Sequence, residues 1–257
     1  MINSLLRDKT IVIMGVRNRW SIAWGIAQAA AEAGANLIFT VQSEREMEQV
    51  SELIKTLGDF PLFRCDVGSD AEITALFTEL KSRFGVIHGL VHAIAHAKAE
   101  DIQHGFVETS RDGFAHALNV SVYSLIALCR AARELMSEGG GVVTLSYIGA
   151  ERVIPGYNVM GVAKAALEAS VRYLAGDLGP QGIRVNAISA GPIKTISAKG
   201  IKNFGNLLEE VAVKTPLGRG INQEDVGGAA LYLLSDLSRG ITGEVLHVDC
   251  GYHMMGV

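Results

Sequence analysis

The amino-acid sequence predicts an α/β fold in a single domain, residues 1–257, with a doubly wound parallel sheet of about seven strands and helices on both faces. Short apolar runs rich in β-branched residues alternate with longer stretches of helical periodicity along the whole chain. The runs are apolar without a break, as strands buried on both faces of a parallel sheet are. The chain carries no repeat or linker-like tract, and its length suits one domain.

The order of these elements defines where a site is expected. The expected strands are Thr10–Val16, Asn36–Val41, Phe60–Cys65, Ile87–Ile94, Gly141–Tyr147, Ile183–Ser189 and Glu244–Val248. The expected helices between them are Ser21–Gly34, Glu44–Leu57, Asp70–Phe84, Arg111–Ser137, Tyr157–Leu178 and Asn222–Leu234. Ligands of such sheets bind beyond the carboxyl ends of the strands, so the site is expected in the loops that follow the first six strands.

Composition and charge limit the classes of function. Hydrophobic residues make up 49% of the chain and charged residues 19%, so we expect a sizeable core and no disorder. The net charge of −4, without a basic stripe, argues against nucleic acid as a partner. Cys65, Cys129 and Cys250 have no paired spacing and are expected to be buried small hydrophobes in a reducing cytosol. Neither a signal-peptide pattern nor an apolar run of membrane-spanning length is found, so we expect a cytoplasmic protein without a membrane partner.

A glycine turn follows the first expected strand. Gly15 leads through a polar turn to Ser21, Ile22 and an alanine-rich helix. A glycine there allows the backbone to approach a pyrophosphate, whose charge the helix N-terminus attracts. Ser21 is placed to cap that helix or to bond a phosphate oxygen. The spacing departs from Gly-x-Gly-x-x-Gly, and a capped turn without a ligand is the alternative interpretation.

The second expected strand ends at Gln42, near the place where dinucleotide-binding (Rossmann-type) folds put the 2′-position of the adenine ribose. Neither an acidic residue nor an arginine or lysine stands at the immediate strand end. Gln42 can hydrogen-bond a free hydroxyl, whereas a 2′-phosphate favours a bidentate cation, for which Arg45 is the only nearby candidate. The pattern therefore favours NADH over NADPH.

The third and fourth strand ends carry further candidate cofactor residues. Asp66, followed by Val67, is suited to accept a hydrogen bond from an adenine amino group. Its alternative role is to cap the next helix, although Ser69 could do that instead. After the fourth strand, the small residues around Ile94 leave room for the cofactor ribose to pass over the backbone.

Three histidines at regular spacing raise the question of a metal site. His88, His92 and His96 recur every four residues. The segment is predicted to be a buried strand running into a loop, not a helix, and no carboxylate or cysteine stands beside it. We therefore expect no metal site.

The fifth expected strand and the following helix carry the candidate chemical groups. The strand delivers Tyr147 to the carboxyl edge, and the helix is expected to start near Tyr157. Tyr157 and Lys164 are seven residues apart, which places them on one helix face. A cation beside a phenol lowers the pKa of the phenol and orients it as a donor, and the same ammonium can hold ribose hydroxyls. The alternative, an ordinary tyrosine and a surface lysine, does not explain why the pair follows a fifth strand in a chain with cofactor signals.

These residues resemble the short-chain dehydrogenase/reductase superfamily and, within it, the enoyl-acyl-carrier-protein reductases. Most of the superfamily carries Tyr-x-x-x-Lys, which would need a tyrosine at Met160. The enoyl reductase branch has Tyr-x6-Lys with a second tyrosine upstream, as Tyr147, Tyr157 and Lys164 do. The resemblance covers nearly the whole chain. Two departures stand out, because the family often has Ser at Ala93 and Phe at His96.

The resemblance implies NADH-dependent reduction of a trans-2-enoyl-acyl-carrier-protein to the saturated thioester in bacterial type II fatty acid elongation. Tyr157 would donate to the developing enolate oxygen, Lys164 would position the nicotinamide ribose, and Tyr147 would line the pocket and help to protonate the α-carbon. The implied substrate contacts are Ala97, Tyr147, Tyr157 and Met160. The implied cofactor contacts are Gly15, Ser21, Ile22, Gln42, Asp66, Val67, Ile94, Lys164, Ile193, Lys194, Thr195, Ile196 and Ser197.

The stretch 192–214 after the sixth strand is expected to be a substrate-binding lid. Its apolar positions form an amphipathic cover suited to an acyl chain, with a plain surface helix as the alternative: Ile201, Phe204, Leu207, Leu208 and Val211. The acyl-carrier partner of the family is acidic, so a basic patch is expected near the lid, with four candidates: Lys194, Lys199, Lys202 and Lys214. The family also implies a homotetramer, to which the apolar C-terminal tail would contribute.

Two rival functions are weighed. A carbonyl or alcohol reductase of the same superfamily should show Tyr-x-x-x-Lys and a serine about a dozen residues before the tyrosine, and Met160 argues against it. A non-catalytic dinucleotide-binding sensor would not need the Tyr157–Lys164 pair.

Overall fold

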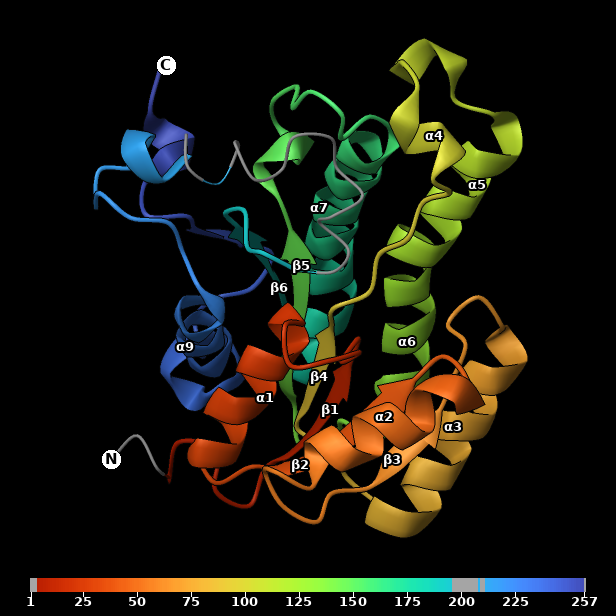
Figure 1. Cartoon of the computed structure of the whole chain (residues 1–257). Helices are drawn as coiled ribbons and strands as arrows, with labels where there is room; N and C mark the ends of the chain where they lie inside the picture. The colour runs from red at the N-terminus through yellow and green to blue at the C-terminus, as the bar shows by residue number, and fades with distance from the viewer. Residues whose placement is uncertain (1–3, 196–207, 209–210, 257) are drawn as a thin grey trace.

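Seven parallel strands form one sheet in the order β3-β2-β1-β4-β5-β6-β7 (Figure 1). The computed structural model describes residues 4–195, 208 and 211–256. The strands are β1 Thr10–Met14, β2 Asn36–Val41, β3 Leu62–Arg64, β4 Gly89–His92, β5 Gly140–Ser146, β6 Ile183–Ala190 and β7 Val245–Val248. The expected doubly wound parallel sheet is confirmed. Its order reverses between β1 and β4, which opens the crevice where such sheets bind ligands.

Helices cover both faces of the sheet, as expected. Side chains of α1, α2 and α9 pack in one apolar cluster against the sheet, and those of α3, α6 and α7 pack in a second cluster (Figure 1). The helices are α1 Ile22–Glu32, α2 Glu44–Ile54, α3 Asp70–Phe84, α4 Glu100–Gln103, α5 Arg111–Leu118, α6 Ser124–Ala132, α7 Val159–Leu178 and α9 Gln223–Leu234. Short 3₁₀ turns lie at η2 Phe106–Glu108, η4 Ile148–Ala150, η5 Gly179–Gln181, η7 Asp236–Ser238 and η8 Tyr252–Met254.

Helices α1 and α9 cross at close range because both carry a glycine at the contact. A Cβ on Gly25 would lie 2.7 Å from the carbonyl oxygen of Gln223, and one on Gly227 would lie 2.7 Å from that of Gly25. The side-chain amide of Gln223 also donates to the carbonyl of Ser21 just before α1. The C-terminal helix therefore fixes where the N-terminus of α1 lies.

Four expected strands are shorter in the structure: β1 ends at Met14 instead of Val16, β7 begins at Val245 instead of Glu244, and β3 and β4 are shortened most. The third was expected from Phe60, but β3 begins at Leu62, since Pro61 has no N–H to donate to the ladder. The carbonyl of Pro61 still accepts from Phe39 and the N–H of Cys65 donates to Val41, so pairing continues past the regular strand. The fourth strand, expected over Ile87–Ile94, is regular only at Gly89–His92.

The long helix expected over Arg111–Ser137 is interrupted and shorter. A π-helical turn, Asn119–Tyr123, separates α5 from α6, and α6 ends at Ala132. The hydroxyl of Ser121 accepts from the N–H of His96 at 3.1 Å, so the wide turn meets the loop after β4. A π turn inside a helix is often found at a functional site, and hydrophobic periodicity does not reveal it.

One helical stretch corrects the expectation that no apolar run is long enough for a membrane. Arg111–Ala132 spans 22 residues with a mean hydropathy of 1.3. Its apolar side chains are explained by the core, because Leu125 and Leu128 are fully buried against α3 and α7. A buried core helix satisfies the same length and composition test.

The cysteines follow the expectation in two of three cases. Cys65 and Cys129 are buried, and burial raises the pKa of each thiol to about 12. Cys250 is only half-buried and has a positive φ of 56° after β7. All three are free thiols.

Candidate active site

The turn after β1 brings its backbone against the end of β4. Gly15 has a φ of 97°, and a Cβ built on it would lie 2.1 Å from the carbonyl oxygen of Ala93. Only glycine fits this contact. The turn therefore packs directly on the end of β4 and leads from there to the N-terminus of α1, where folds of this kind bind the diphosphate of a dinucleotide.

Ser21 stabilises this turn rather than the helix that it precedes. It occupies the N-cap position of α1, but its side chain makes no cap hydrogen bond. Its Oγ instead accepts from the N–H groups of Arg17 at 3.1 Å and Asn18 at 3.2 Å. The first turn of α1, which starts at the half-buried Ile22, keeps N–H groups that no side chain caps, and such groups suit a phosphate.

The end of β2 carries an acidic side chain that the sequence analysis missed. Gln42 itself is exposed, and its N–H donates to Oε2 of Glu46 at 3.2 Å. Oε1 of Glu46 accepts from Nε of Arg17 at 2.9 Å. A signal was present, because the residues from Ser43 to Glu46 form the Ser-x-x-Glu pattern of a capping box, which turns a glutamate back over the start of a helix.

After β3, the side chain of Asp66 is fixed by its own loop. Its Oδ1 accepts from the N–H of Gly68 at 2.9 Å, and the hydroxyl of Ser69 accepts from Glu72 as the N-cap of α3. The alternative in which Asp66 caps the helix is therefore wrong, and Ser69 does so. Asp66 stays half-buried at the carboxyl edge beside the buried Val67.

The two candidate tyrosines meet at the end of β5. Tyr147 directly follows the strand, and Tyr157 lies two residues before α7. Their ring centroids are 5.0 Å apart with an interplanar angle of 73°, an edge-to-face contact. Residues from two different segments thus place two phenols side by side.

The residue after Tyr157 holds the start of α7 in an uncommon conformation. Asn158 has a φ of 43° and a ψ of −124°, which is rare for a residue with a side chain. Its Nδ2 donates to the carbonyl oxygens of Ile102 at 2.8 Å and His104 at 2.6 Å. The amide therefore ties the tyrosine segment to the end of α4, and the sequence analysis did not single it out.

Lys164 lies in the second turn of α7, but Tyr157 precedes the helix and the backbone of Asn158 between them is not helical, so the expected placement of the pair on one helix face is wrong. The side chain of Lys164 is 6% exposed, and Nζ donates to the carbonyl oxygen of Leu145 at 2.7 Å. Burial lowers the pKa of Lys164 to about 8, and the negative charge of Glu168 opposes that shift. The ammonium is thus held at the end of β5, available to a ligand bound over this edge.

The expected lowering of the phenol pKa is not observed. Burial, and secondarily the neighbouring Tyr147, raises the pKa of Tyr157 above its ordinary value. Burial also raises the pKa of Tyr147 to about 12, with a smaller contribution from Tyr252. Both phenols are therefore neutral hydrogen-bond donors at physiological pH, because removal from water outweighs any distant cation.

Two buried polar residues missed by the sequence analysis surround Lys164. Glu168, one turn further along α7, accepts a hydrogen bond from the hydroxyl of Ser146, and burial raises its pKa. His92 lies between Thr144 Oγ1 at 2.8 Å and Ser124 Oγ at 2.9 Å. Burial and the charge of Lys164 lower the pKa of His92 to about 3, so the ring stays neutral. A helical i, i+4 spacing of Lys and Glu was the available signal for the first of these.

The candidate substrate residues lie on the same side of the site. Met160 is buried in the first turn of α7, and Ala97 is half-buried after β4. Next to Ala97, Nδ1 of His96 lies 2.7 Å from Nε2 of His116, with the two rings edge to face. His96, which departs from the family pattern, thus contacts a second histidine, His116 on α5.

The strand end after β6 completes the edge. Ile193 is buried, Lys194 is exposed and Thr195 is half-buried, while Ile94 after β4 is half-buried. The expected contacts Ile196 and Ser197 lie outside the described residues, as do Lys199, Lys202 and three of the apolar lid positions, Ile201, Phe204 and Leu207. The other two apolar lid positions are described: Leu208 is half-buried and Val211 is buried.

The three spaced histidines have separate roles. His88 accepts from the N–H of Thr10 at 3.0 Å, His92 is the buried ring described above, and His96 contacts His116. Within the described part of the chain, no group of three or more His, Cys, Asp and Glu side chains could hold a metal ion.

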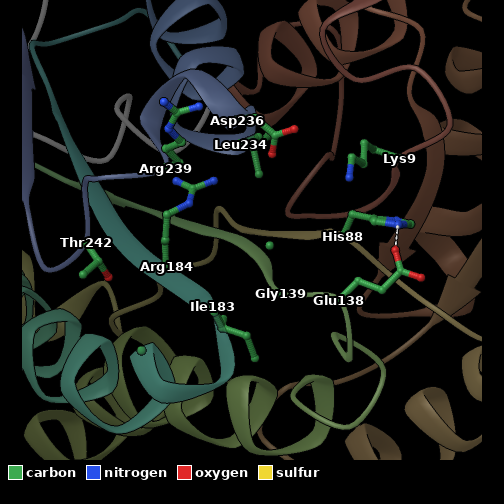
Figure 2. Close-up of a pocket in the computed structure, with 13 residues that line it drawn as sticks. Lys9, His88, Glu138, Gly139, Ile183, Arg184, Leu234, Asp236, Arg239 and Thr242 are labelled. Atoms are coloured by element: carbon green, nitrogen blue, oxygen red, sulfur yellow. Dashed lines mark ion pairs between the residues drawn. The ribbon is translucent and has the colours of Figure 1, made fainter.

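A polar hollow of about 300 Å³ lies at the opposite edge of the sheet (Figure 2). Nε2 of His88 lies 3.5 Å from Oε2 of Glu138 there, and the guanidinium of Arg184 donates to the carbonyl of Leu233 and to the hydroxyl of Ser238. Arg184, at the start of β6, is thus bonded to the end of α9 and to η7. This hollow is remote from Tyr157 and Lys164, which lie at the carboxyl ends of the strands.

Three features together define a dinucleotide-dependent oxidoreductase of the short-chain dehydrogenase/reductase type. They are a sheet with this order, a glycine turn after its first strand, and a buried lysine on α7 seven residues after a half-buried tyrosine. A family model described as enoyl-(acyl carrier protein) reductase matches residues 15–253. The chain belongs to this enoyl-(acyl carrier protein) reductase family.

Individual relatives agree over nearly full length. The chain is 55% identical to enoyl-[acyl-carrier-protein] reductase [NADH] FabI of Bacillus cereus, over 98% of this chain and 99% of that protein. It is 49% identical to the protein of the same name from Rickettsia prowazekii, over 100% of this chain and 98% of that protein.

Solved structures show the same similarity. The Bacillus cereus enoyl-acyl carrier protein reductase with NADP⁺ and indole naphthyridinone has a TM-score of 0.97 and 55% identity, covering 99% of this chain and 100% of that one. The Anaplasma phagocytophilum reductase in complex with NAD has a TM-score of 0.96 and 47% identity, covering 99% and 97%.

Proposed function

We propose that this chain catalyses the NADH-dependent reduction of a trans-2-enoyl-acyl-carrier-protein to the saturated acyl thioester, the reductive step of fatty acid elongation. The observation that carries the proposal is the contact between the Tyr147 and Tyr157 rings at the edge where Lys164 is buried. Membership of the family and the names of relatives at about half identity support the same reaction and cofactor.

The residues present fit a bound dinucleotide. The diphosphate would lie beside Gly15 and at the uncapped first turn of α1, next to Ser21 and Ile22. The adenosine would lie among Gln42, Asp66, Val67 and Ile94, and the nicotinamide end would contact Lys164, Ile193, Lys194 and Thr195. The cofactor supplies the hydride when it is bound.

The chain itself supplies alignment and a hydrogen-bond donor. Negative charge develops on the thioester oxygen when the double bond is reduced, and a preorganised neutral phenol aimed at that oxygen lowers the barrier. Tyr157 is that donor, and its raised pKa keeps the proton in place. Lys164 binds the nicotinamide ribose and adds positive potential below its pKa of about 8. Tyr147, Met160 and Ala97 line the acyl side.

The remaining features belong to the same proposal. The acyl-carrier protein would dock beside residues 192–214, near the exposed Lys194 and Lys214. A substrate lid in that stretch, a cytoplasmic location and a homotetramer remain predictions. Size-exclusion chromatography with light scattering tests the last of these.

The test is NADH oxidation by the purified protein with a trans-2-enoyl thioester, followed by the loss of cofactor absorbance. We expect turnover with the enoyl thioester and none with a matched β-ketoacyl thioester. Turnover of the ketone instead would show a carbonyl reductase. Tight dinucleotide binding without turnover of either substrate would show a sensor.

A further inference from the structure

An ion pair joins the two loops between which the adenine ribose of a dinucleotide is expected. Arg17 belongs to the turn after β1, and Glu46 belongs to the first turn of α2 after β2. Nε and NH2 of Arg17 each lie 2.9 Å from the same oxygen, Oε1 of Glu46. Because β1 and β2 are neighbouring parallel strands, these two loops lie side by side at the carboxyl edge of the sheet.

The carboxylate of Glu46 is anchored more firmly than a usual surface acid. Its second oxygen, Oε2, accepts the N–H of Gln42 at 3.2 Å, so the group is tied to the end of β2 itself. The side chain of Glu46 is 19% exposed, whereas that of Arg17 is 63% exposed. The carboxylate is therefore fixed in the loop, and the guanidinium extends over it into solvent.

Both residue types that decide between the two nicotinamide cofactors are thus present and bonded to each other. An acidic group near the end of the second strand accepts a hydrogen bond from a free 2′-hydroxyl, and an arginine there holds a 2′-phosphate. The carboxylate of Glu46 accepts hydrogen bonds from Arg17 and from the N–H of Gln42. A carboxylate has about four acceptor sites, so Glu46 can still accept a hydrogen bond from a ribose hydroxyl. The negative charge of Glu46 would repel a 2′-phosphate. Glu46 also bonds the guanidinium of Arg17, the group that would otherwise bind that phosphate.

We propose that Glu46 is a specificity-determining residue that selects NADH over NADPH, and that Arg17 is a phosphate-binding cation held inactive by Glu46. This inference rests on the proposed function for the identity of the cofactor. It assigns the selection to an ion pair rather than to Gln42, whose side chain is exposed. It also assigns the latent cation to Arg17 rather than to Arg45.

The test measures dinucleotide binding directly, by isothermal titration calorimetry of the purified full-length protein with NADH and with NADPH. Glu46→Gln removes the charge but keeps an oxygen for the N–H of Gln42, so the loop stays closed. Glu48→Gln, an exposed glutamate on the same helix, is the matched control. Two double variants, Glu46→Gln with Arg17→Ala and Glu46→Gln with Arg45→Ala, identify the cation.

The wild type is expected to bind NADH more tightly than NADPH by roughly tenfold or more. In Glu46→Gln, NADPH binding should tighten by about tenfold, because one repulsive charge is lost and one guanidinium is released. The gain should disappear when Arg17 is also removed, persist when Arg45 is removed, and weaken as salt is added. Glu48→Gln should behave as the wild type.

Several results would overturn the proposal. They are equal binding of both cofactors by the wild type, an unchanged NADPH-to-NADH ratio in Glu46→Gln, or a gain that depends on Arg45 instead of Arg17. In each of these cases the protein still binds a dinucleotide, so the proposed function survives. If the wild type binds neither cofactor, the proposed function fails together with this inference.

Discussion

The cofactor end and the chemical end of the site are built in opposite ways. Around Gly15, Ser21 and Glu46, exposed or half-buried side chains bond the main chain of short loops. Around Lys164 and Glu168, polar groups are almost completely removed from water. Exposed charges can be exchanged at little cost to the fold, whereas buried ones cannot. The comparison explains how cofactor choice can vary while the chemical groups stay fixed.

The largest effect is expected from removing the buried ammonium. Lys164→Met keeps a side chain of similar length and loses the charge. We expect kcat/KM to fall by about 100-fold or more, since positive potential and the ribose contact are both lost. The melting temperature should fall as well, because the carbonyl of Leu145 loses its donor and the buried Glu168 loses the neighbouring positive charge.

Steady-state kinetics and thermal unfolding of the same preparation check this prediction. Activity within a few-fold of the wild type would show that Lys164 has only a structural role. An unchanged melting temperature would show that its bond to the carbonyl of Leu145 does not stabilise the fold.

The next effect concerns the start of α7. Asn158→Ala loses two amide hydrogen bonds and leaves an alanine at a φ of 43°. We expect a loss of about 2 kcal/mol in the free energy of unfolding, measured in urea, and a fall in kcat because the adjacent Tyr157 is less well positioned. Asn158→Gly separates the causes, since glycine accepts the backbone conformation. If both variants match the wild type, Asn158 does not fix this segment.

A pH profile sharpens the chemical side of the comparison. Lys164 is charged below its pKa of about 8 and loses its proton above it, so the rate should fall as the pH rises through about 8. Removing the negative charge of Glu168, which raises that pKa, should move the fall to lower pH by about one unit in Glu168→Gln.

The pH profile needs a control for the other titratable groups near Lys164 and on α7. His92 stays neutral because its pKa is about 3, so it does not titrate in the same range. Asp177→Asn removes an exposed charge from the far end of α7 and should leave the profile unchanged. Rescue of the wild-type profile by Glu168→Asp would confirm the role of the charge. An unshifted profile in Glu168→Gln would exclude it.

The smallest effect is expected at the cofactor end. Ser21→Ala removes the hydroxyl that accepts from two loop N–H groups. We expect a few-fold rise in the dissociation constant of NADH and an unchanged kcat, because the loop loses order but no chemical group is lost. If kcat fell as far in Ser21→Ala as in Lys164→Met, the claim that the cofactor end affects binding and the chemical end affects the rate would be wrong.

Much of the fold could be predicted because the strands of a parallel sheet are buried on both faces and therefore appear in the sequence as unbroken apolar runs. β2 and α3 have the bounds that periodicity gave, whereas β3 is cut short by Pro61. The π turn at Asn119–Tyr123 could not be foreseen, since it preserves helical composition while changing the hydrogen-bond spacing.

At the candidate site, the sequence singled out Tyr147, Tyr157 and Lys164, but the predicted lowering of the phenol pKa was wrong. The pKa of Tyr157 depends on burial, which arises from the packing of η4 and α7 rather than from local sequence. Glu46 and Glu168 were missed because each is defined by a partner distant in the chain, Arg17 and Ser146. Such pairs are fixed by the tertiary fold.

The central claim is that the phenol of Tyr157 donates to the substrate oxygen. It is tested most directly by the single-turnover rate of NADH oxidation with a saturating trans-2-enoyl thioester, comparing Tyr157→Phe with Tyr173→Phe. Tyr173 lies on α7, the helix that follows Tyr157, and it is 80% exposed. We predict a loss of about 100-fold or more for Tyr157→Phe, as for the removal of other preorganised donors, and no loss for Tyr173→Phe. A Tyr157→Phe rate equal to that of Tyr173→Phe would contradict the account.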